Sequence, residues 1–233
     1  MPKCVIRQSA GLGDIMFCQK IGKTFIKRGY EVIWPVIPHY YNIINKYMPS
    51  NIKYCSSEED YPYKDLVSNN ITQITNIGDD IFIPLEKCTC GWDFMRDKYK
   101  FVDINYTDWQ DYFEFTRDLN REKTLEKFLE LDRYPEYIFV NGQFATPPDT
   151  EIRLITPNTH KMIIEMTYLG FDNVFDWCGV IENADEIHTV DTVICYIIEK
   201  LVTKGDLNIY TRNNPQRGFK YQGAFLKPWV YHL

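Results

Sequence analysis

An aspartate that closes a turn of small residues is the first group in this chain that could do chemistry. Residues 9–14 read Ser-Ala-Gly-Leu-Gly-Asp, and they follow a short apolar run at 4–6. Ligands of parallel α/β sheets bind where the strands end, and a carboxylate placed there can take a proton as a general base. Asp14 is therefore our candidate catalytic residue. The alternative is that it caps the following helix by accepting hydrogen bonds from free backbone N–H groups.

Two glycines in the same turn, Gly11 and Gly13, permit close approach of the backbone to a ligand and positive φ angles. A plain tight turn explains them equally well. Replacement of Asp14 by Asn separates its two interpretations only in part, because Asn also caps helices. If Asp14 is a base, we expect this variant to lose activity and to keep its melting temperature almost unchanged.

A second set of polar residues follows predicted strands in the second half of the chain. Residues 188–192 read His-Thr-Val-Asp-Thr at a strand-to-helix junction, where Asp191 or Thr192 can cap the helix. Hydroxyls and backbone N–H groups at such a helix start can also hold a phosphate. The candidate ligand-binding residues of this half are Asn141, Gly142, Gln143, Arg153, His188, Thr189, Asp191 and Thr192.

Structural roles compete with binding roles at two of these positions. Arg153 could neutralise phosphate charge, but long basic side chains usually lie at a solvated surface. His188 alternates with apolar residues along a predicted strand, and a lone strand histidine is more often structural.

The elements that position these residues alternate between strands and helices. In the first half we expect strands near 4–6, 31–37, 51–55 and 80–85, with helices from 15 onward, over 39–47 and over 92–99. One or two helices are expected within 108–131, followed by strands at 137–141, 152–155, 162–166, 174–177, 185–190 and 207–210, helices at 178–184 and 192–201, and a polar loop at 142–150. The pattern predicts an α/β fold of two Rossmann-like lobes facing a cleft, divided into residues 1–125 and 126–233.

Composition and charge argue against several classes of protein. The net charge is −6, whereas a protein that coats nucleic acid is usually basic. The apolar runs are far shorter than the roughly 20 residues of a membrane span, and the first residues lack the apolar core of a signal peptide. We therefore expect a cytoplasmic protein without a membrane span. The 7 scattered cysteines, with Cys88 and Cys90 as the close pair, favour reduced thiols over disulfides or a metal site.

Several motifs of well-known enzyme classes are absent from the sequence. There is no Gly-x-Gly-x-x-Gly for a dinucleotide, no P-loop, and no Gly-x-Ser-x-Gly of a serine hydrolase. There is also no Asp-x-Asp triplet, which would hold a divalent ion against a diphosphate.

Two segments resemble GT-B glycosyltransferases, most closely heptosyltransferase-like proteins. Ile181-Glu-Asn-Ala184 is similar to a helix of that group, and Val190-Asp-Thr192 to the turn beside its nucleotide sugar. The stretch Gly11-Leu-Gly-Asp14 is similar to the Gly-Asp motif that carries its catalytic base. The resemblance implies that Asp14 is the base, that the second half grips the donor and that the first half holds the acceptor.

We therefore hypothesise a glycosyltransferase that moves a sugar from a nucleotide sugar to an acceptor hydroxyl, without a metal and with inversion. The nucleotide sugar is a co-substrate, no cofactor is expected, and the acceptor is a carbohydrate or glycan. One alternative is a non-catalytic module that binds glycans or nucleotides. The short chain favours it, as does Val193, which stands where the resembled group has glycine. A nucleotide-sugar epimerase is the other alternative.

Overall fold

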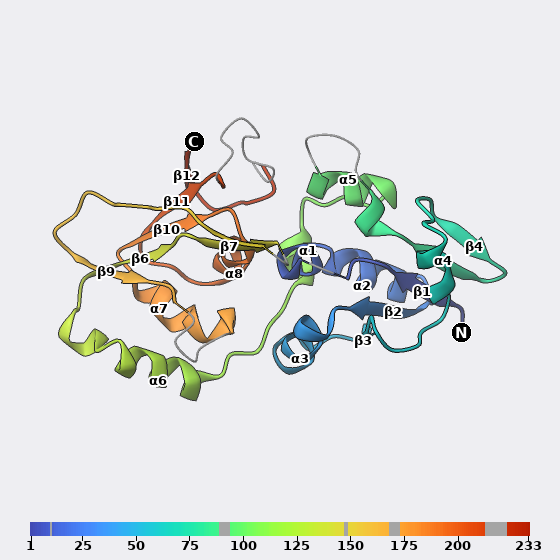
Figure 1. Cartoon of the computed structure of the whole chain (residues 1–233), viewed down its shortest axis with the longest axis horizontal. Helices are drawn as coiled ribbons and strands as arrows, with labels where there is room; N and C mark the ends of the chain where they lie inside the picture. Colours follow the sequence, from blue (N-terminus) through green and yellow to red (C-terminus); the bar gives the residue numbers. More distant parts are fainter. Residues whose placement is uncertain (10, 89–93, 147–148, 168–172, 213–222) are drawn as a thin grey trace. The chain divides into compact units, whose positions relative to one another are not determined.

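The structure is a computed structural model that describes all residues except 10, 89–93, 147–148, 168–172 and 213–222. The chain divides into two compact units, Met1–Thr116 and Arg117–Leu233 (Figure 1). The two units meet between residues 116 and 117, before helix α6 (Leu119–Phe128) begins. The boundary expected from the sequence, between residues 125 and 126, falls inside this helix. Because α6 packs against helix α7 (Cys178–Asn183), it belongs to the second unit.

The first unit is built on a five-stranded sheet with the strand order β3-β2-β1-β5-β4. Strands β1, β2, β3 and β5 run parallel, whereas β4 pairs antiparallel with β5. The strands are Lys3–Ile6 (β1), Glu31–Val36 (β2), Lys53–Ser56 (β3), Thr75–Ile77 (β4) and Asp80–Ile83 (β5). Cys4, Val5 and Ile6 of β1 are all fully buried, as expected for a central parallel strand that is covered on both faces.

Helices cover both faces of this sheet. They are α1 (Leu12–Phe17), α2 (Gln19–Lys27), α3 (Pro38–Tyr47), α4 (Lys64–Ser68) and α5 (Phe94–Phe101), with the 3-10 turns η1 (Leu85–Lys87) and η2 (Trp109–Tyr112). The helix expected from residue 15 onward is thus two helices, which meet at Cys18. Gly22 brings α2 close to the sheet, since a Cβ atom there would lie 2.5 Å from Ile52 and 3.3 Å from Trp34. On the other face, Val5 and Phe82 pack against residues of α4.

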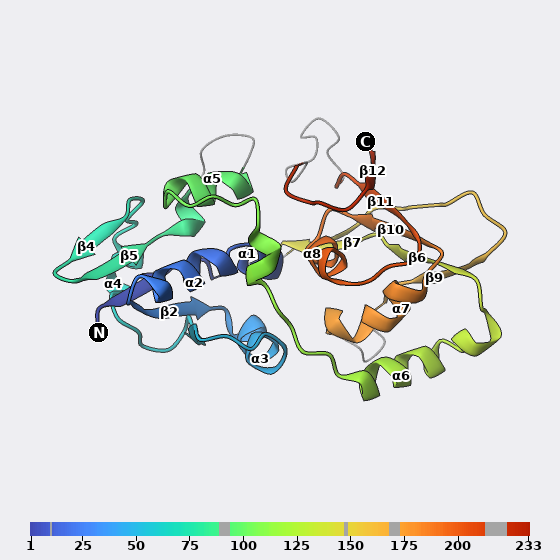
Figure 2. The same cartoon turned by 180° about the vertical axis from the view of Figure 1, so that it is seen from behind.

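The second unit contains another five-stranded sheet, with the order β12-β11-β10-β6-β9, in which every pair is parallel (Figure 2). The strands are Tyr137–Asn141 (β6), Met162–Glu165 (β9), Glu186–Val190 (β10), Asp206–Tyr210 (β11) and Trp229–His232 (β12). The expectation that the strand at 207–210 is the last one was wrong, because β12 pairs with β11 and extends the sheet by one more strand.

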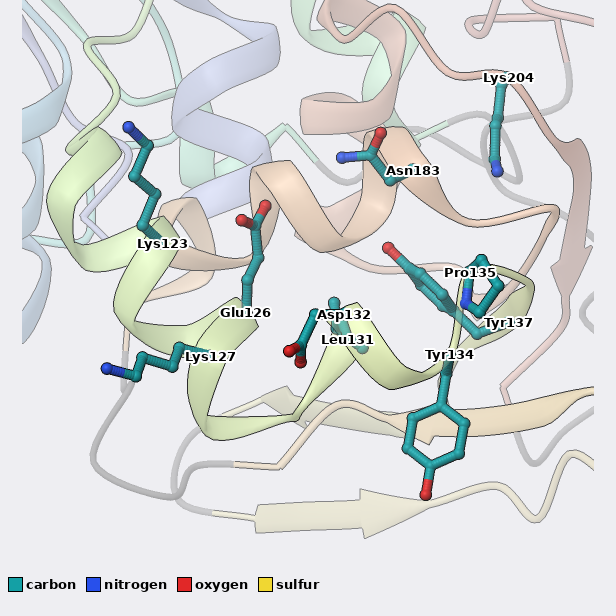
Figure 3. Close-up of a pocket in the computed structure, with 10 residues that line it drawn as sticks. All are labelled: Lys123, Glu126, Lys127, Leu131, Asp132, Tyr134, Pro135, Tyr137, Asn183 and Lys204. Carbon is teal, nitrogen blue, oxygen red and sulfur yellow. The ribbon is translucent and has the colours of Figure 1, made fainter.

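One face of the second sheet is covered by α7 and α8 (Val193–Lys200). Phe139 of β6 contacts Trp177, and Trp229 of β12 donates a hydrogen bond to Glu199 of α8. Residues 174–177, expected as a strand, form the 3-10 turn η4 (Val174–Trp177), because the side chain of Asn173 accepts a hydrogen bond from the Phe175 backbone N–H and starts a turn. A pocket of about 630 Å³ lies between α6, the 3-10 turn η3 (Leu131–Arg133) and the end of α7 (Figure 3).

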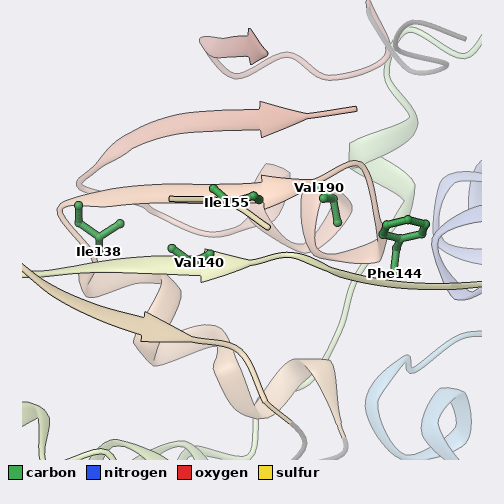
Figure 4. Packing of buried hydrophobic residues seen from close by; sticks show 5 residues of the cluster. All are labelled: Ile138, Val140, Phe144, Ile155 and Val190. Atoms are coloured by element: carbon green, nitrogen blue, oxygen red, sulfur yellow. The ribbon is translucent and has the colours of Figure 1, made fainter. Parts of the chain in front are cut away.

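The other face of the second sheet is covered in part by irregular chain. Ile138, Val140 and Val190 pack there against Phe144 and Ile155 (Figure 4). The polar loop expected at 142–150 contains two short antiparallel strands, β7 (Gln143–Thr146) and β8 (Asp149–Ile152). The strand expected at 152–155 was wrong beyond residue 152, where the chain leaves β8 and crosses the sheet. No helix in the described part of the chain is long and apolar enough to cross a membrane.

Candidate active site

Asp14 lies in the first turn of α1, the helix that follows β1 in the chain. Gly11 precedes the helix with a φ of +81°, a conformation that side chains other than glycine rarely adopt. A Cβ atom at position 11 would also lie 2.5 Å from Oδ2 of Asp14. Glycine at 11 is therefore required both by the backbone and by the position of the Asp14 carboxylate, while Gly13 is buried within α1.

The carboxylate of Asp14 is paired with a lysine that comes from α5. Nζ of Lys98 contacts Oδ1 of Asp14 and donates a second hydrogen bond of 2.7 Å to Oε1 of Gln8. The Lys98 side chain is completely buried, whereas 21% of the Asp14 side chain is exposed. Gly11 is the N-cap residue of α1, and no side-chain capping bond is found there among the described residues. The side-chain contact found for Asp14 among the described residues is its ion pair with Lys98, and its place in the first turn of α1 also sets a negative charge near the helix N-terminus.

The surroundings of this ion pair are apolar. Cys18 is fully buried, and burial raises the pKa of its thiol to about 12; the charge of Lys98 lowers this pKa and the charge of Asp14 raises it, each by less than burial does. Phe17 packs edge-to-face on Tyr99, with ring centroids 5.0 Å apart. Low polarity strengthens electrostatic interactions, so the partner of Asp14 matters more here than it would at an open surface.

A second ionic cluster holds the loop between β1 and α1. Oε2 of Glu86 accepts hydrogen bonds from the hydroxyl of Ser9 at 2.9 Å and from its backbone N–H at 3.4 Å. Oε1 of the same carboxylate lies 3.4 Å from Nε of Arg7. Glu86 follows β5, so this cluster ties the ends of two neighbouring strands to the loop that carries the glycines.

The second unit brings four of its predicted residues together where its strands end. The Asn141 amide donates to the hydroxyl of Thr189 at 3.0 Å and to that of Thr192 at 3.3 Å. Its carbonyl oxygen accepts a hydrogen bond of 3.3 Å from the backbone N–H of Gln143. Asn141 therefore links the end of β6 to the end of β10 and to the start of α8.

Thr192 is the residue that caps α8. Its hydroxyl accepts a hydrogen bond of 3.4 Å from the backbone N–H of Ile194. Asp191 is joined to its neighbours through its backbone, since its N–H donates to Tyr210 at 3.0 Å and its carbonyl oxygen accepts from Nε of Arg212 at 2.9 Å. The guanidinium of Arg212 also lies 5.4 Å from the centroid of the Phe144 ring. Arg212 was not among the residues predicted from the sequence, although it lies two positions after a predicted strand.

Arg153 and Gly142 also meet at this end of the second sheet. Arg153 donates to the hydroxyl of Thr211 at 2.7 Å, to its backbone oxygen, and to the backbone oxygen of Leu233 at 3.1 Å. The backbone N–H of Arg153 donates to the Gly142 carbonyl at 2.8 Å. A Cβ atom at 142 would overlap the backbone oxygen of Arg153, so glycine permits this close approach. We call Asn141, Thr192, Arg153 and Arg212 the second polar edge.

His188 lies on a face of the second sheet rather than at its edge. Its Nδ1 is 2.9 Å from the hydroxyl of Tyr210, and its Nε2 is 3.2 Å from a carboxylate oxygen of Glu186. The ring of Tyr210 stacks on His232, with centroids 4.5 Å apart. Neighbours on β10 and β11 thus engage His188, while Thr189 points to the opposite face and reaches Asn141.

Side chains that could hold a metal ion do not gather in the described part of the chain, where no group of three or more His, Cys, Asp or Glu residues is found. Cys88 donates a hydrogen bond from its thiol to the backbone oxygen of Asp97 at 3.3 Å. Cys90, its neighbour in the sequence, lies outside the described residues.

Comparisons with known proteins identify the fold. No family model matches the chain, and no curated protein matches it in sequence. The chain is similar to the crystal structure of a glycosyl transferase family 9 protein from Veillonella parvula, with a TM-score of 0.56 and 9% identity over 99% of this chain and 86% of that chain. It is also similar to the dodecameric, iron-containing heptosyltransferase TibC in complex with ADP-D-beta-D-heptose, with a TM-score of 0.51 and 7% identity.

The second similarity covers 100% of this chain and 63% of TibC, so the chain spans less than two thirds of that relative. At these identities the likeness concerns the fold alone. The expectation of an α/β fold related to GT-B glycosyltransferases is confirmed by both similarities and by the two sheets. The chain has a GT-B-like, heptosyltransferase-like fold.

Proposed function

We propose that this protein is a glycosyltransferase that moves a sugar from a nucleotide-sugar donor to the hydroxyl of a carbohydrate acceptor. The observation that carries the proposal is the set of charged side chains that lie where the two sheets end, in a fold shared with glycosyltransferases. One sheet ends beside a partly exposed carboxylate, Asp14, and the other ends beside two guanidiniums, Arg153 and Arg212.

The second polar edge suits the diphosphate of the donor. Guanidinium groups recognise phosphate oxygens through charge-assisted hydrogen bonds, and Arg153 and Arg212 both stand where strands of one sheet end. Thr192 and the first N–H groups of α8 add further hydrogen-bonding groups at the same edge. With two cations to offset the charge of the leaving diphosphate, the proposed transfer is metal-independent.

Asp14 supplies the base in the proposed reaction. The acceptor oxygen forms a bond to the anomeric carbon while the bond from that carbon to the β-phosphate oxygen breaks. The hydroxyl proton passes to the Asp14 carboxylate, and the electron pair of the broken bond leaves with the nucleoside diphosphate. Attack on the face opposite the leaving group inverts the anomeric configuration.

A panel of nucleotide sugars tests the proposal. ADP-heptose, the sugar nucleotide in the TibC complex, and common ADP-, UDP- and GDP-sugars are incubated with the protein while release of nucleoside diphosphate is measured. We expect slow hydrolysis of at least one donor and its loss in Asp14→Asn, with Asp111→Asn, an exposed acid of the same unit, as the control. No turnover and no thermal shift with any donor would count against the proposal.

Two other outcomes identify the alternatives. A donor that raises the melting temperature but is never turned over indicates a binding module without catalysis. Conversion of the donor to an isomer without release of nucleoside diphosphate indicates an epimerase.

A further inference from the structure

Lys98 is a buried cation that belongs to none of the motifs found in the sequence. Its side chain is fully buried, and its ammonium reaches from α5 to two acceptors that lie near the end of β1, Oδ1 of Asp14 and Oε1 of Gln8. Removing an ammonium from water is costly unless a counter-charge and hydrogen-bond acceptors replace the water. Asp14 supplies the counter-charge, so the burial of Lys98 depends on the presence of that carboxylate.

The same contacts restrict the orientation of the carboxylate. The ammonium of Lys98 holds Oδ1. Oδ2 lies close to Gly11, since a Cβ atom at position 11 would lie 2.5 Å from it. A carboxylate held on one side and confined on the other has little freedom to rotate about its χ angles. A base must lie within hydrogen-bond reach of the proton that it takes, so such a restriction contributes directly to a transfer reaction.

We infer that Lys98 is the positioning residue for Asp14. It binds one carboxylate oxygen and leaves the other to receive the proton of the acceptor hydroxyl. This inference rests on the proposed function, in which Asp14 is the base. It assigns no contact between Lys98 and either substrate, because the ammonium is completely buried behind Asp14.

Kinetics of nucleoside diphosphate release test the inference with Lys98→Met, Asp14→Asn and the double variant. We expect each single variant to lower kcat about 100-fold with little change in KM, since loss of orientation and loss of the base affect the same step. The double variant should be no slower than the slower single variant, because two residues that act as a unit are not additive. Lys98→Met with an unchanged kcat, or with losses that multiply in the double variant, would overturn the positioning role.

Lys20→Met is the matched control, because Lys20 is another buried lysine of the first unit and pairs with Asp108. It should lower the melting temperature without changing kcat. If it lowers kcat as much as Lys98→Met does, general destabilisation explains both effects and the inference fails.

A second measurement separates this inference from the proposed function. If the wild-type protein releases no nucleoside diphosphate from any donor of the panel, the proposed function fails. Crystal structures of the wild-type and Lys98→Met proteins then decide the orientation of Asp14. A carboxylate that turns away from its wild-type position supports the inference, and one that keeps its position overturns it.

Discussion

Replacement of Asn141 by alanine tests whether one amide holds the second polar edge together. Asn141 is 3% exposed, so its hydrogen bonds are not readily replaced by water. The substitution removes its hydrogen bonds to the hydroxyls of Thr189 and Thr192 and leaves the backbone N–H of Gln143 without this acceptor. Thr192 keeps its capping bond to Ile194, so α8 should still begin at the same residue.

The magnitude follows from these bonds. An intramolecular hydrogen bond contributes about 1 kcal/mol net, so the loss of the three bonds predicts a destabilisation of roughly 3 kcal/mol. The matched control is Asn183→Ala at the end of α7, whose amide donates one bond of 2.9 Å to the carbonyl of Gly179 within the same helix. That control predicts a loss of about 1 kcal/mol or less, because alanine also favours the helix.

Urea unfolding monitored by circular dichroism measures both variants. We expect Asn141→Ala to be less stable than Asn183→Ala by about 2 kcal/mol. In addition, Asn141→Ala should bind the active donor of the nucleotide-sugar panel more weakly, whereas Asn183→Ala should bind it as the wild type does. Equal destabilisation by the two substitutions would refute the reasoning, because the link between β6 and α8 would then have no measurable energy.

Three further substitutions test other parts of the structure. Gly142→Ala should destabilise the protein by about 1–3 kcal/mol, because its Cβ atom would overlap the backbone oxygen of Arg153; an unchanged melting temperature would contradict this close approach. Arg121→Met should lower the free energy of unfolding, measured in urea, by about 3–5 kcal/mol, because Arg121 donates hydrogen bonds of 2.7–3.0 Å to the fully buried carboxylate of Asp176. The double variant Arg121→Met/Asp176→Leu removes the buried charge as well and should recover stability; no recovery would contradict this explanation. Burial, with the charges of His188 and Arg153, lowers the pKa of His232 below its ordinary 6.5. His232 of the unfolded chain therefore takes up a proton at a higher pH than His232 of the folded protein does. Its contribution to folding stability should be complete above about pH 6.5 and should be lost as the pH falls through the lowered pKa of the folded state. Melting temperatures at about pH 8 and about pH 5.5 should differ less in His232→Gln than in the wild type, and an equal difference would exclude this contribution.

Local sequence patterns predicted those helices and strands whose conformation depends mainly on residues within the element itself. The run at 4–6, the glycine turn and the run at 31–37 became β1, α1 with α2, and β2. Thr192 was expected as a possible cap, and its hydroxyl caps α8. These signals depend on residues within a few positions of one another, so one sequence is enough to show them.

The errors lie where tertiary contacts decide the conformation. The stretch 174–177, Val-Phe-Asp-Trp, suits a strand or a single turn, and the turn is stabilised by Asn173 and by Arg121 of α6, which binds Asp176. The strand β12 was missed because its conformation depends on pairing with β11. A short strand has little signal of its own when its partner supplies the hydrogen bonds.

The ion-pair partner of Asp14 could not be predicted from the sequence either. Lys98 is separated from it by 84 residues, and nothing in the pattern of a helix distinguishes a lysine that turns inward from one that faces water. This partner also alters the test proposed from the sequence. Asp14→Asn removes the counter-charge of a buried ammonium, so we now expect a lower melting temperature together with any loss of activity.

The two sheets share an architecture but end in different chemistry, and this difference favours a reaction with two unlike substrates. The first sheet ends in carboxylates, Asp14 and Glu86, which are held by cations from elsewhere in the same unit. The second ends in Arg153 and Arg212, which are held by hydroxyl and backbone oxygens. If these charged side chains served only to stabilise the fold, the same kind of ion pair could be used at the ends of both sheets. Under the proposed function, the Asp14 carboxylate would accept the proton, and Arg153 and Arg212 would stabilise the anionic leaving group; sugar transfer from a nucleoside diphosphate requires both.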